Sequence, residues 1–441
     1  MKVLKFGGTS VGSAARMKAV ADLINTGESN IVVLSAMSGT TNALVEISEA
    51  FKSGDDKLAL KLTNTLEEKY IGVAGEFYDS AKSKASALSF IKQIFDGLKE
   101  NKSTDFGSRD EKTILAQGEL ISTGLFQLYL EEAGVKSILL PALDFMKIDK
   151  DEEPDKRYIS RNLKKLLQLN PSYDIYLTQG YICRNIHGEI DNLKRGGSDY
   201  SASLIGAAIN AEEIQIWTDI DGMHNNDPRI VPNTYPIARL SFDEAAELAY
   251  FGAKILHPAS VRPAKDKNIP VRLLNTMAPD KEGTVIEAES EEGGIKAVAA
   301  KDGITAIKIK SGRMLLAFGF LKKVFDIFEK YRTPIDMITT SEVAVSLTID
   351  NTSHLDEITK KLERLGQVSV DSNQTIICVV GDFIADKPGF ILQIFEVLKN
   401  IPIRMVSYGG SKHNVSLLIN TDFKKEALLA LNEGLFAVQH A

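Results

Sequence analysis

Residues 2–34 read KVLKFGGTSVGSAARMKAVADLINTGESNIVVL, and the spacing of their apolar positions predicts a strand, a helix and a second strand. The first short apolar run ends at Gly7-Gly8. The helical stripe that follows has apolar residues three and four positions apart, namely Ala14, Met17, Val20, Ala21 and Ile24. The next run, IVVL, is apolar on both faces, as in a buried strand. A strand-helix-strand unit at this spacing favours a parallel sheet covered by helices.

The same alternation resumes after a mainly helical stretch at about 40–170. Runs of apolar residues predict further strands at 173–179, 214–217 and 269–274. Ser241 and Glu244 form a capping-box pattern that predicts a helix start. Residues 278–296 are rich in Asp, Glu, Lys and Gly, which is typical of a domain boundary.

An internal repeat with a period near 70 residues occupies the chain beyond about residue 300. Three segments recur in order: Gly319-Phe320 as Gly389-Phe390, Pro334-Ile335 as Pro402-Ile403, and Val345-Ser346-Leu347 as Val415-Ser416-Leu417. Each copy is expected to run strand, helix, strand, strand, helix, strand. The repeat therefore predicts two βαββαβ modules of the size of small ligand-binding domains.

Composition and charge narrow the class of protein. A length of 441 residues fits about three domains. The net charge of −7 argues against nucleic acid as the main partner, because phosphate contacts need a surplus of Lys and Arg. Cys183 and Cys378 lie too far apart for a disulfide framework or a zinc motif. No apolar run has the length of about 20 residues that spans a bilayer, and Gly7-Gly8 comes too early for a signal-peptide core. We expect a cytoplasmic protein with no membrane partner.

Two glycine-rich turns are candidates for phosphate binding. Lys5-Phe6-Gly7-Gly8-Thr9-Ser10 lies where a strand turns into a helix, and Arg195-Gly196-Gly197-Ser198-Asp199 precedes the apolar helix expected at 201–210. Glycines let the backbone approach an anion, and a helix N-terminus offers free N–H donors. A plain structural turn and a capped helix are the alternatives at these positions. Two such turns, each flanked by a cation, favour phosphate binding.

A third candidate stretch, Trp217 to Gly222, ends a strand, which is where ligands usually bind in an α/β sheet. It does not fit an EF-hand, because Met223 and Ile230 occupy the fifth and twelfth loop positions. A solvated turn is the alternative. His257 precedes a proline and is expected to end a helix, and no Ser-His-Asp or Cys-His arrangement suggests nucleophilic catalysis.

Taken together, the ordered motifs resemble those of aspartate kinases over essentially the whole chain. The motifs are Lys5 to Ser10, Ser35-Ala36-Met37-Ser38-Gly39, Gln117-Gly118-Glu119, Arg195 to Asp199, Trp217-Thr218-Asp219, and Tyr250-Phe251-Gly252-Ala253-Lys254-Ile255-Leu256-His257-Pro258. The C-terminal repeat, with Ile338-Thr339-Thr340-Ser341-Glu342-Val343, resembles the paired ACT regulatory modules of that family.

The resemblance implies an amino-acid-kinase fold, an α/β sandwich with a mostly parallel central sheet, followed by two ferredoxin-like ACT modules. The implied limits are a catalytic domain at 1–280, a linker at 281–300, and modules at 301–366 and 367–441. The implied reaction is transfer of the ATP γ-phosphoryl group to the β-carboxylate of L-aspartate, with Mg²⁺. This is the first step of lysine, threonine and methionine synthesis.

By match to the family motifs, each site residue carries an implied role. Lys5 and Asp199 are the implied catalytic residues. The aspartate pocket would comprise Ser35, Thr41, Glu119, Arg195 and Ser198. Phosphate and nucleotide contacts would come from Lys5, Gly7, Gly8, Ser10, Thr218, Asp219, His224, Arg229 and Lys254. Mg²⁺ is expected on phosphate oxygens and water, without an assigned protein ligand.

Regulation is expected at the ACT modules. Met314, Ile335, Asp336, Thr340 and Ser341 match effector-site positions, with lysine as the first choice of effector and threonine as the second. A role in packing the repeat interface, without control by an effector, is the alternative. A homodimer or a dimer of dimers is the expected assembly. The competing functions are a kinase for another amino acid, such as glutamate, a sensor whose kinase half is inactive, and a scaffold.

Overall fold

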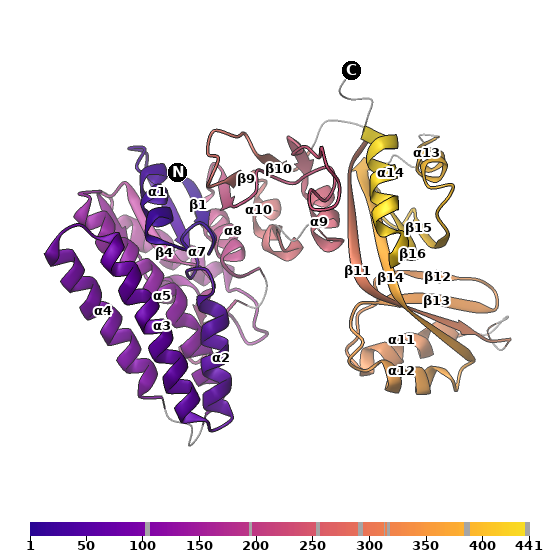
Figure 1. The fold of residues 1–441 in the computed structure, drawn as a ribbon, viewed down its shortest axis with the longest axis horizontal. Coiled ribbons are helices and arrows are strands. Elements are labelled where there is room, and N and C mark those ends of the chain that lie inside the picture. The colour runs from indigo at the N-terminus through magenta and orange to yellow at the C-terminus, as the bar shows by residue number, and fades with distance from the viewer. Residues whose placement is uncertain are drawn as a thin grey trace. The chain divides into compact units, whose positions relative to one another are not determined.

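The computed structural model describes residues 1–101, 106–193, 196–252, 256–289, 294–312, 314, 318–382 and 389–436. The chain folds into two compact units. The first unit comprises Met1–Met223, Ala238–Phe242 and Leu256–Ser290, and the second comprises His224–Ile237, Asp243–Ile255 and Glu291–Ala441. Figure 1 shows both units, coloured by residue number from the N-terminus to the C-terminus.

An eight-stranded sheet forms the centre of the first unit, in the order β3-β4-β2-β1-β7-β9-β10-β8. All neighbouring strands run parallel except β9 and β10, which run antiparallel. In chain order the strands are β1 (Lys2–Phe6), β2 (Asn30–Leu34), β3 (Ser137–Leu139), β4 (Ile175–Gln179), β7 (Ile214–Thr218), β8 (Arg239–Ser241), β9 (Val271–Asn275) and β10 (Thr284–Glu287). The mostly parallel α/β sheet expected from the sequence is confirmed.

The expected strand-helix-strand unit is β1, helix α1 (Ala14–Ile24) and β2. All five apolar stripe residues of α1 are buried, and every residue of β2 is buried. Ser13 caps the helix, because its side chain accepts a hydrogen bond from the Arg16 N–H. The period of the apolar residues therefore placed both the helix and its buried face correctly.

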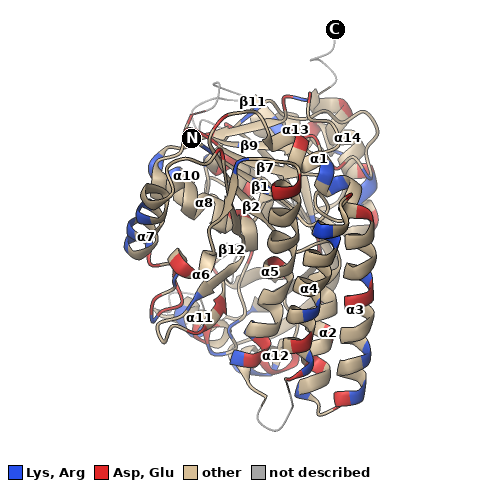
Figure 2. Cartoon of the chain, turned by 90° about the vertical axis from the view of Figure 1, so that its left-hand side faces the viewer, with Lys and Arg blue, Asp and Glu red and all other residues tan. Residues whose placement is uncertain are grey.

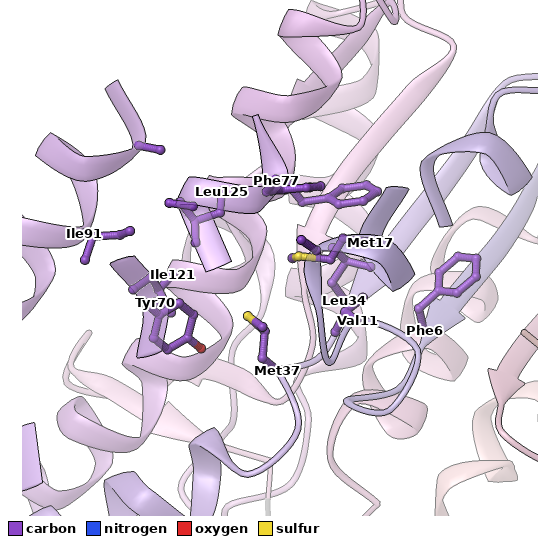
Figure 3. Packing of buried hydrophobic residues seen from close by; sticks show 14 of the residues in the cluster. Phe6, Val11, Met17, Leu34, Met37, Tyr70, Phe77, Ile91, Ile121 and Leu125 are labelled. Carbon is purple, nitrogen blue, oxygen red and sulfur yellow. The ribbon is translucent and has the colours of Figure 1, made fainter. Parts of the chain in front are cut away.

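Helices fill most of the stretch that was expected to be mainly helical. They are α2 (Thr40–Lys52), α3 (Asp56–Phe77), α4 (Ala81–Lys99), α5 (Ser108–Glu132), α6 (Ala142–Phe145) and α7 (Lys156–Leu169). Helices α2 to α5 lie side by side in Figure 1. They share one hydrophobic core with α1 and the sheet, and Figure 3 shows part of it, including Met17, Leu34, Tyr70, Phe77 and Leu125. The short strand β3 within this stretch was not predicted.

The first unit has further elements that follow β4 in the chain. They are the antiparallel hairpin of β5 (Ile182–Arg184) and β6 (Ile190–Asn192), helix α8 (Gly197–Ile209), the 3-10 helix η2 (Pro258–Ser260) and helix α10 (Arg262–Lys267). Helix α9 (Phe242–Tyr250), which belongs to the second unit from Asp243 on, follows Ser241, as the capping-box pattern predicted. His257 does not end a helix, contrary to expectation: it precedes η2, and its Nδ1 accepts a hydrogen bond from the Ala259 N–H (3.1 Å).

A six-stranded antiparallel sheet forms the centre of the second unit, in the order β12-β13-β11-β14-β16-β15. Its strands are β11 (Gly294–Lys310), β12 (Ile338–Thr340), β13 (Ala344–Ile349), β14 (Gln367–Asp382), β15 (Ile403–Tyr408) and β16 (Asn414–Asn420). Its helices are α11 (Phe320–Lys330), α12 (Leu355–Leu362), α13 (Phe390–Val397), η3 (Thr421–Phe423) and α14 (Lys424–Phe436).

The two repeats share the long strands β11 and β14, which pair along their whole length. One hydrophobic core contains Ile307 and Ile309 from the end of β11, and the other contains Val298 from its beginning. The second module therefore takes its last strand from the start of β11, which precedes the first module in sequence. Strand β10 and the start of β11 also lie within 281–300, the stretch expected to be a linker.

None of the helices in the described part of the chain is long and apolar enough to cross a membrane.

Candidate active site

The first glycine turn lies at the carboxyl end of β1, where it is packed tightly against its neighbours. A Cβ atom on Gly8 would lie 2.9 Å from the Ala36 carbonyl oxygen, closer than real side chains come. The Gly8 carbonyl in turn accepts a hydrogen bond from the Ser38 N–H (3.1 Å). Glycine is therefore required at position 8, because two backbone segments meet there without room for a side chain.

Lys5 and Asp199 form a close ion pair between the two glycine turns. The distance from Lys5 Nζ to Asp199 Oδ1 is 2.6 Å, and the side chains are 12% and 15% exposed. Lys5 comes from β1, and Asp199 lies in the first turn of α8, where the helix dipole favours a carboxylate. Gly196 has a φ of +63° at the start of this helix, a conformation that glycine adopts without strain.

A cavity of about 520 Å³ opens beside this pair. It is lined by the first glycine turn, the loop from β2 to α2, helix α5, the turn after β4 and the start of α8. The lining residues are Gly8, Thr9, Ser35, Ala36, Met37, Ser38, Gly39, Thr41, Asn42, Glu119, Tyr181, Gly197 and Ser198. The structure thus brings Gly8 and four of the five residues expected around aspartate to one cavity.

The polar groups of this cavity are connected to one another. Ser35 Oγ donates to Ser198 Oγ (2.8 Å), and the Ala36 N–H donates to Glu119 Oε1 (3.2 Å). Glu119 is only 4% exposed. Burial raises the pKa of Glu119 to about 7, although hydrogen bonds from the backbone and the charge of Lys5 oppose the rise. A buried carboxylate on the cavity wall is suited to receive a cationic group.

Other candidate residues of the first unit lie at the ends of β1 and β7. Ser10 is fully buried, and its hydroxyl lies 2.7 Å from that of Thr276. Thr218 ends β7, beside β1, and its Oγ1 donates to Asp219 Oδ1 (3.1 Å). Gly7 is held to the end of β7, because its N–H donates to the Trp217 carbonyl (3.3 Å).

Two residues expected at the nucleotide belong to the second unit. His224 Nδ1 lies 2.8 Å from Thr234 Oγ1. The exposed Arg229 guanidinium donates twice to the carboxylate of Asp227, at 2.9 and 2.8 Å. Arg195 and Lys254 lie outside the described residues.

The candidate effector residues range from partly buried to exposed. Met314 and Ile335 pack against the core of the first module. Thr340 at the end of β12 and Ser341 after it are exposed. The Asp336 side chain is only 1% exposed, and Lys301 Nζ and the Tyr250 hydroxyl both donate to its Oδ1 at 2.8 Å. Asp336 therefore already faces an ε-ammonium group, one that belongs to this chain.

Eight cavity residues were not among the predicted site residues: Thr9, Ala36, Met37, Ser38, Gly39, Asn42, Tyr181 and Gly197. All of them except Asn42 and Tyr181 belong to the motifs on which the family resemblance rests, so their position in sequence was a signal. Tyr181 had a weaker signal, since it follows Gly180 at the end of a predicted strand. The only sequence signal for Asn42 was its position beside Thr41.

A second cavity, of about 560 Å³, lies among α7, α8 and α10 and contains none of the predicted site residues. Its rim is basic, and Figure 2 shows Lys and Arg along α7. Within the described residues, no three His, Cys, Asp or Glu side chains gather closely enough to hold a metal ion.

Comparisons with known proteins identify the family of this chain. Residues 1–275 match the model of the amino acid kinase family, and residues 377–435 match that of an ACT domain. The first match covers more than half of the chain, so the class of protein is an amino acid kinase. The chain is 35% identical over 464 residues to aspartokinase 3, chloroplastic, of Arabidopsis thaliana, covering 98% of this chain and 81% of that protein.

A bacterial relative matches over nearly its full length. Lysine-sensitive aspartokinase 3 of Escherichia coli (strain K12) is 31% identical over 455 residues, covering 98% of this chain and 99% of that protein. The crystal structure of E. coli aspartokinase III with aspartate and ADP, in the R-state, has a TM-score of 0.82 at 30% identity, covering 99% of this chain and all of that one. The complex with lysine and aspartate, in the T-state, has a TM-score of 0.81 at the same identity and covers 99% of each chain. The chain belongs to the aspartokinases.

Proposed function

We propose that this chain transfers the γ-phosphoryl group of ATP to the β-carboxylate of L-aspartate, giving 4-phospho-L-aspartate. The observation that carries the proposal is the ion pair of Lys5 and Asp199 beside a cavity that contains the buried Glu119. The E. coli structure with aspartate and ADP supports it by similarity.

The chemistry of this reaction requires cations more than a base. A carboxylate nucleophile is already ionised at pH 7, so no strong general base is needed. The difficulty lies in bringing an anionic nucleophile to an anionic phosphate, which favours positioning and charge neutralisation. Lys5 is proposed to neutralise charge on the transferring phosphoryl group. Asp199 would hold the ammonium group of Lys5 in place through the 2.6 Å contact.

Glu119 is proposed to receive the α-ammonium group of aspartate. Ser35, Thr41 and Ser198 would complete the pocket, with Arg195 holding a substrate carboxylate through two aligned hydrogen bonds. The phosphates would meet the backbone of Gly7 and Gly8, with Ser10 at the same turn. By the family resemblance, the nucleotide would be held by Thr218, Asp219, His224, Arg229 and Lys254.

Mg²⁺ is proposed to accompany ATP as a complex with its phosphates. Such an ion is expected to be held by phosphate oxygens and water, without an assigned protein ligand. When bound, the ion would neutralise phosphate charge. The residues of this chain would then position the phosphates and the carboxylate.

Trapping the acyl phosphate tests the proposed reaction. Hydroxylamine converts an acyl phosphate to a hydroxamate, which is measured by its ferric complex. We expect hydroxamate from L-aspartate only when ATP and Mg²⁺ are both present, and far less from L-glutamate. Equal or greater product from glutamate would instead indicate a kinase for another amino acid.

Feedback control by lysine through the ACT modules is proposed, with threonine as the second candidate effector. The name of the lysine-sensitive relative supports this choice. A lysine ε-ammonium that approached Asp336 would compete with Lys301, which already occupies that carboxylate and also contacts Asp350 at 2.9 Å.

Replacing Thr340 with isoleucine is expected to relieve inhibition by lysine while leaving the uninhibited rate unchanged. Thr340 is exposed at the end of β12, so the larger side chain alters the proposed effector surface without disturbing the core. Isoleucine also keeps the strand preference of threonine. The measurement is kinase activity against lysine concentration, with Thr352→Ile on an exposed turn as the matched control. An unchanged inhibition curve would remove Thr340 from the effector site.

Replacing Lys301 with methionine is expected to lower the lysine concentration that gives half inhibition, by about fivefold or more. The change removes the internal cation that competes for Asp336 and keeps much of the side-chain volume. Lys322→Met, at an exposed ion pair on α11, is the control. Weaker or unchanged inhibition would show that effector lysine does not compete with Lys301.

The biological setting is also proposed from the relatives. The reaction would be the first step of lysine, threonine and methionine synthesis, in the cytoplasm. A homodimer, or a dimer of dimers, is proposed through the ACT modules. Exposed apolar side chains on the first module support an interface there, namely Phe318, Leu321, Phe325 and Val343.

A further inference from the structure

Tyr181 has a strained backbone on the wall of the candidate aspartate cavity. Its φ is +65°, in the left-handed region that bulky residues rarely adopt. The Ile182 N–H donates to the Gly180 carbonyl (2.7 Å), which closes a three-residue turn centred on Tyr181. Strain of this kind persists only where the surroundings hold it, and it gathers at functional sites.

Three further hydrogen bonds hold Tyr181 in this conformation. Its N–H donates to Ser201 Oγ (2.8 Å), and its carbonyl accepts from the Leu193 N–H (2.8 Å). Its phenol oxygen accepts from Asn192 Nδ2 (2.7 Å). The backbone and the ring of Tyr181 are therefore both fixed, by helix α8 and by the hairpin of β5 and β6.

The same hairpin is fastened to α5, the helix that carries Glu119. Lys112 Nζ lies 2.6 Å from Asp191 Oδ2, and that aspartate side chain is only 4% exposed. Arg109 and Glu189 form a second, outer pair at 3.3 Å. Lys112 and Glu119 are seven residues apart, about two helical turns, so they share one face of α5. The hairpin thus fixes the position of Tyr181 relative to that of Glu119.

Tyr181 and Glu119 are close enough to influence each other. Both line the cavity, and a Cβ atom on Gly197 would lie 3.9 Å from Tyr181 Cδ2. Burial raises the pKa of Tyr181, and the Glu119 carboxylate adds to the rise. The phenol ring therefore lies near both the proposed ammonium-binding carboxylate and the start of α8, which carries Ser198 and Asp199.

We propose that Tyr181 is a specificity-determining residue whose braced ring limits the length of the amino acid that the cavity accepts. An acidic amino acid with one side-chain methylene would reach from Glu119 to the reacting phosphate. One with two methylenes would meet the ring. This inference rests on the proposed function, because it assumes that aspartate occupies this cavity. The strained turn would be retained because it directs the aromatic ring to the cavity wall, which an extended backbone at this position would not do.

The test compares kcat/KM for L-aspartate and L-glutamate in Tyr181 variants. Tyr181→Gly removes the ring while adopting the positive φ without strain. We expect it to reduce the preference for aspartate by about tenfold or more, since discrimination of one methylene is typically ~10- to 200-fold. Tyr181→Phe keeps the ring and should stay close to the wild-type preference. Tyr181→Asn, which tolerates this backbone, gives a second ring-free variant if the glycine variant does not fold.

A matched control relieves strain elsewhere. Asn268→Gly changes an exposed residue with a φ of +53° at the end of α10, outside the cavity, and should leave the preference unchanged. A wild-type preference in a folded ring-free variant would overturn the inference while leaving the kinase intact. A wild-type enzyme without activity on aspartate would instead refute the proposed function, and this inference with it.

Discussion

Replacing Lys5 with alanine is expected to lower kcat by about 10²- to 10³-fold and to change the KM for aspartate far less. Lys5 is proposed to meet charge that develops on the phosphoryl group in the transition state. Loss of one preorganised partner for such charge typically has an effect of this size. Lys5 is nearly buried, so water would replace its ammonium group poorly. Steady-state kinetics at saturating ATP separates the two parameters.

Controls for this prediction come from the same strand. Lys2, also on β1, forms a loose pair with Glu28 at 3.5 Å and is more exposed, so Lys2→Ala should have nearly normal kinetics. Lys5→Arg retains a cation but cannot reproduce the compact ammonium group, and should recover only part of the rate. A Lys5→Ala enzyme with near-normal kcat would show that Lys5 does not act on the transition state.

Aspartate affinity is expected to rise with pH through about 7 and to lose this dependence when Glu119 becomes glutamine. Burial raises the pKa of Glu119 to about 7, so below that pH the side chain is largely neutral and attracts an ammonium group weakly. Glu119→Gln should raise the dissociation constant at pH 8 by roughly ten- to a hundredfold, as for a lost hydrogen bond to a charged group. Calorimetric titration with aspartate, from pH 6 to 8, measures both effects.

The stability of the ligand-free protein gives an independent check on Glu119. Its folded-state pKa of about 7 lies above the ordinary value of 4.5, so the folded protein binds the proton more tightly than the unfolded chain. The stabilisation from this proton is present at low pH and is lost as pH rises from about 4.5 through 7. The Tm of wild type relative to Glu119→Gln should therefore fall over this range. A constant difference would mean that Glu119 is ionised throughout.

The candidate site could be predicted where chemistry lies in contiguous motifs. Lys5 lies beside a glycine turn at the end of a strand, and Asp199 follows a glycine turn at the start of a helix. Turns of this kind gather at one edge of a parallel sheet. Tyr181 was missed because its positive φ is imposed by Ser201, Leu193 and Asn192, which are distant in sequence. The pairing of Asp336 with Lys301 was missed for the same reason.

The fold was predictable where the spacing of apolar residues and the local composition indicate a helix or a strand. The buried stripe of α1 and the wholly buried β2 follow directly from their apolar spacing. The sharing of β11 between the two modules does not, because it depends on pairing with β14 about 70 residues away. The charged stretch before Gly294 also suggested a linker, although a long strand begins at that residue. The polarity of the local sequence gave no indication that β11 would contribute residues to two hydrophobic cores.

The most direct test of the account is the chemical identity of the phosphorylated carboxylate. Borohydride reduces an acyl phosphate to an alcohol, so 4-phospho-L-aspartate yields homoserine, while phosphorylation of the α-carboxylate yields 3-amino-4-hydroxybutyrate. Incubation with L-aspartate, ATP and Mg²⁺, followed by reduction and mass spectrometry with chromatographic standards, distinguishes the two. We predict homoserine, formed at a strongly reduced rate by Lys5→Ala. Formation of the other isomer, or of no reduced product by the folded wild-type enzyme, would contradict the account.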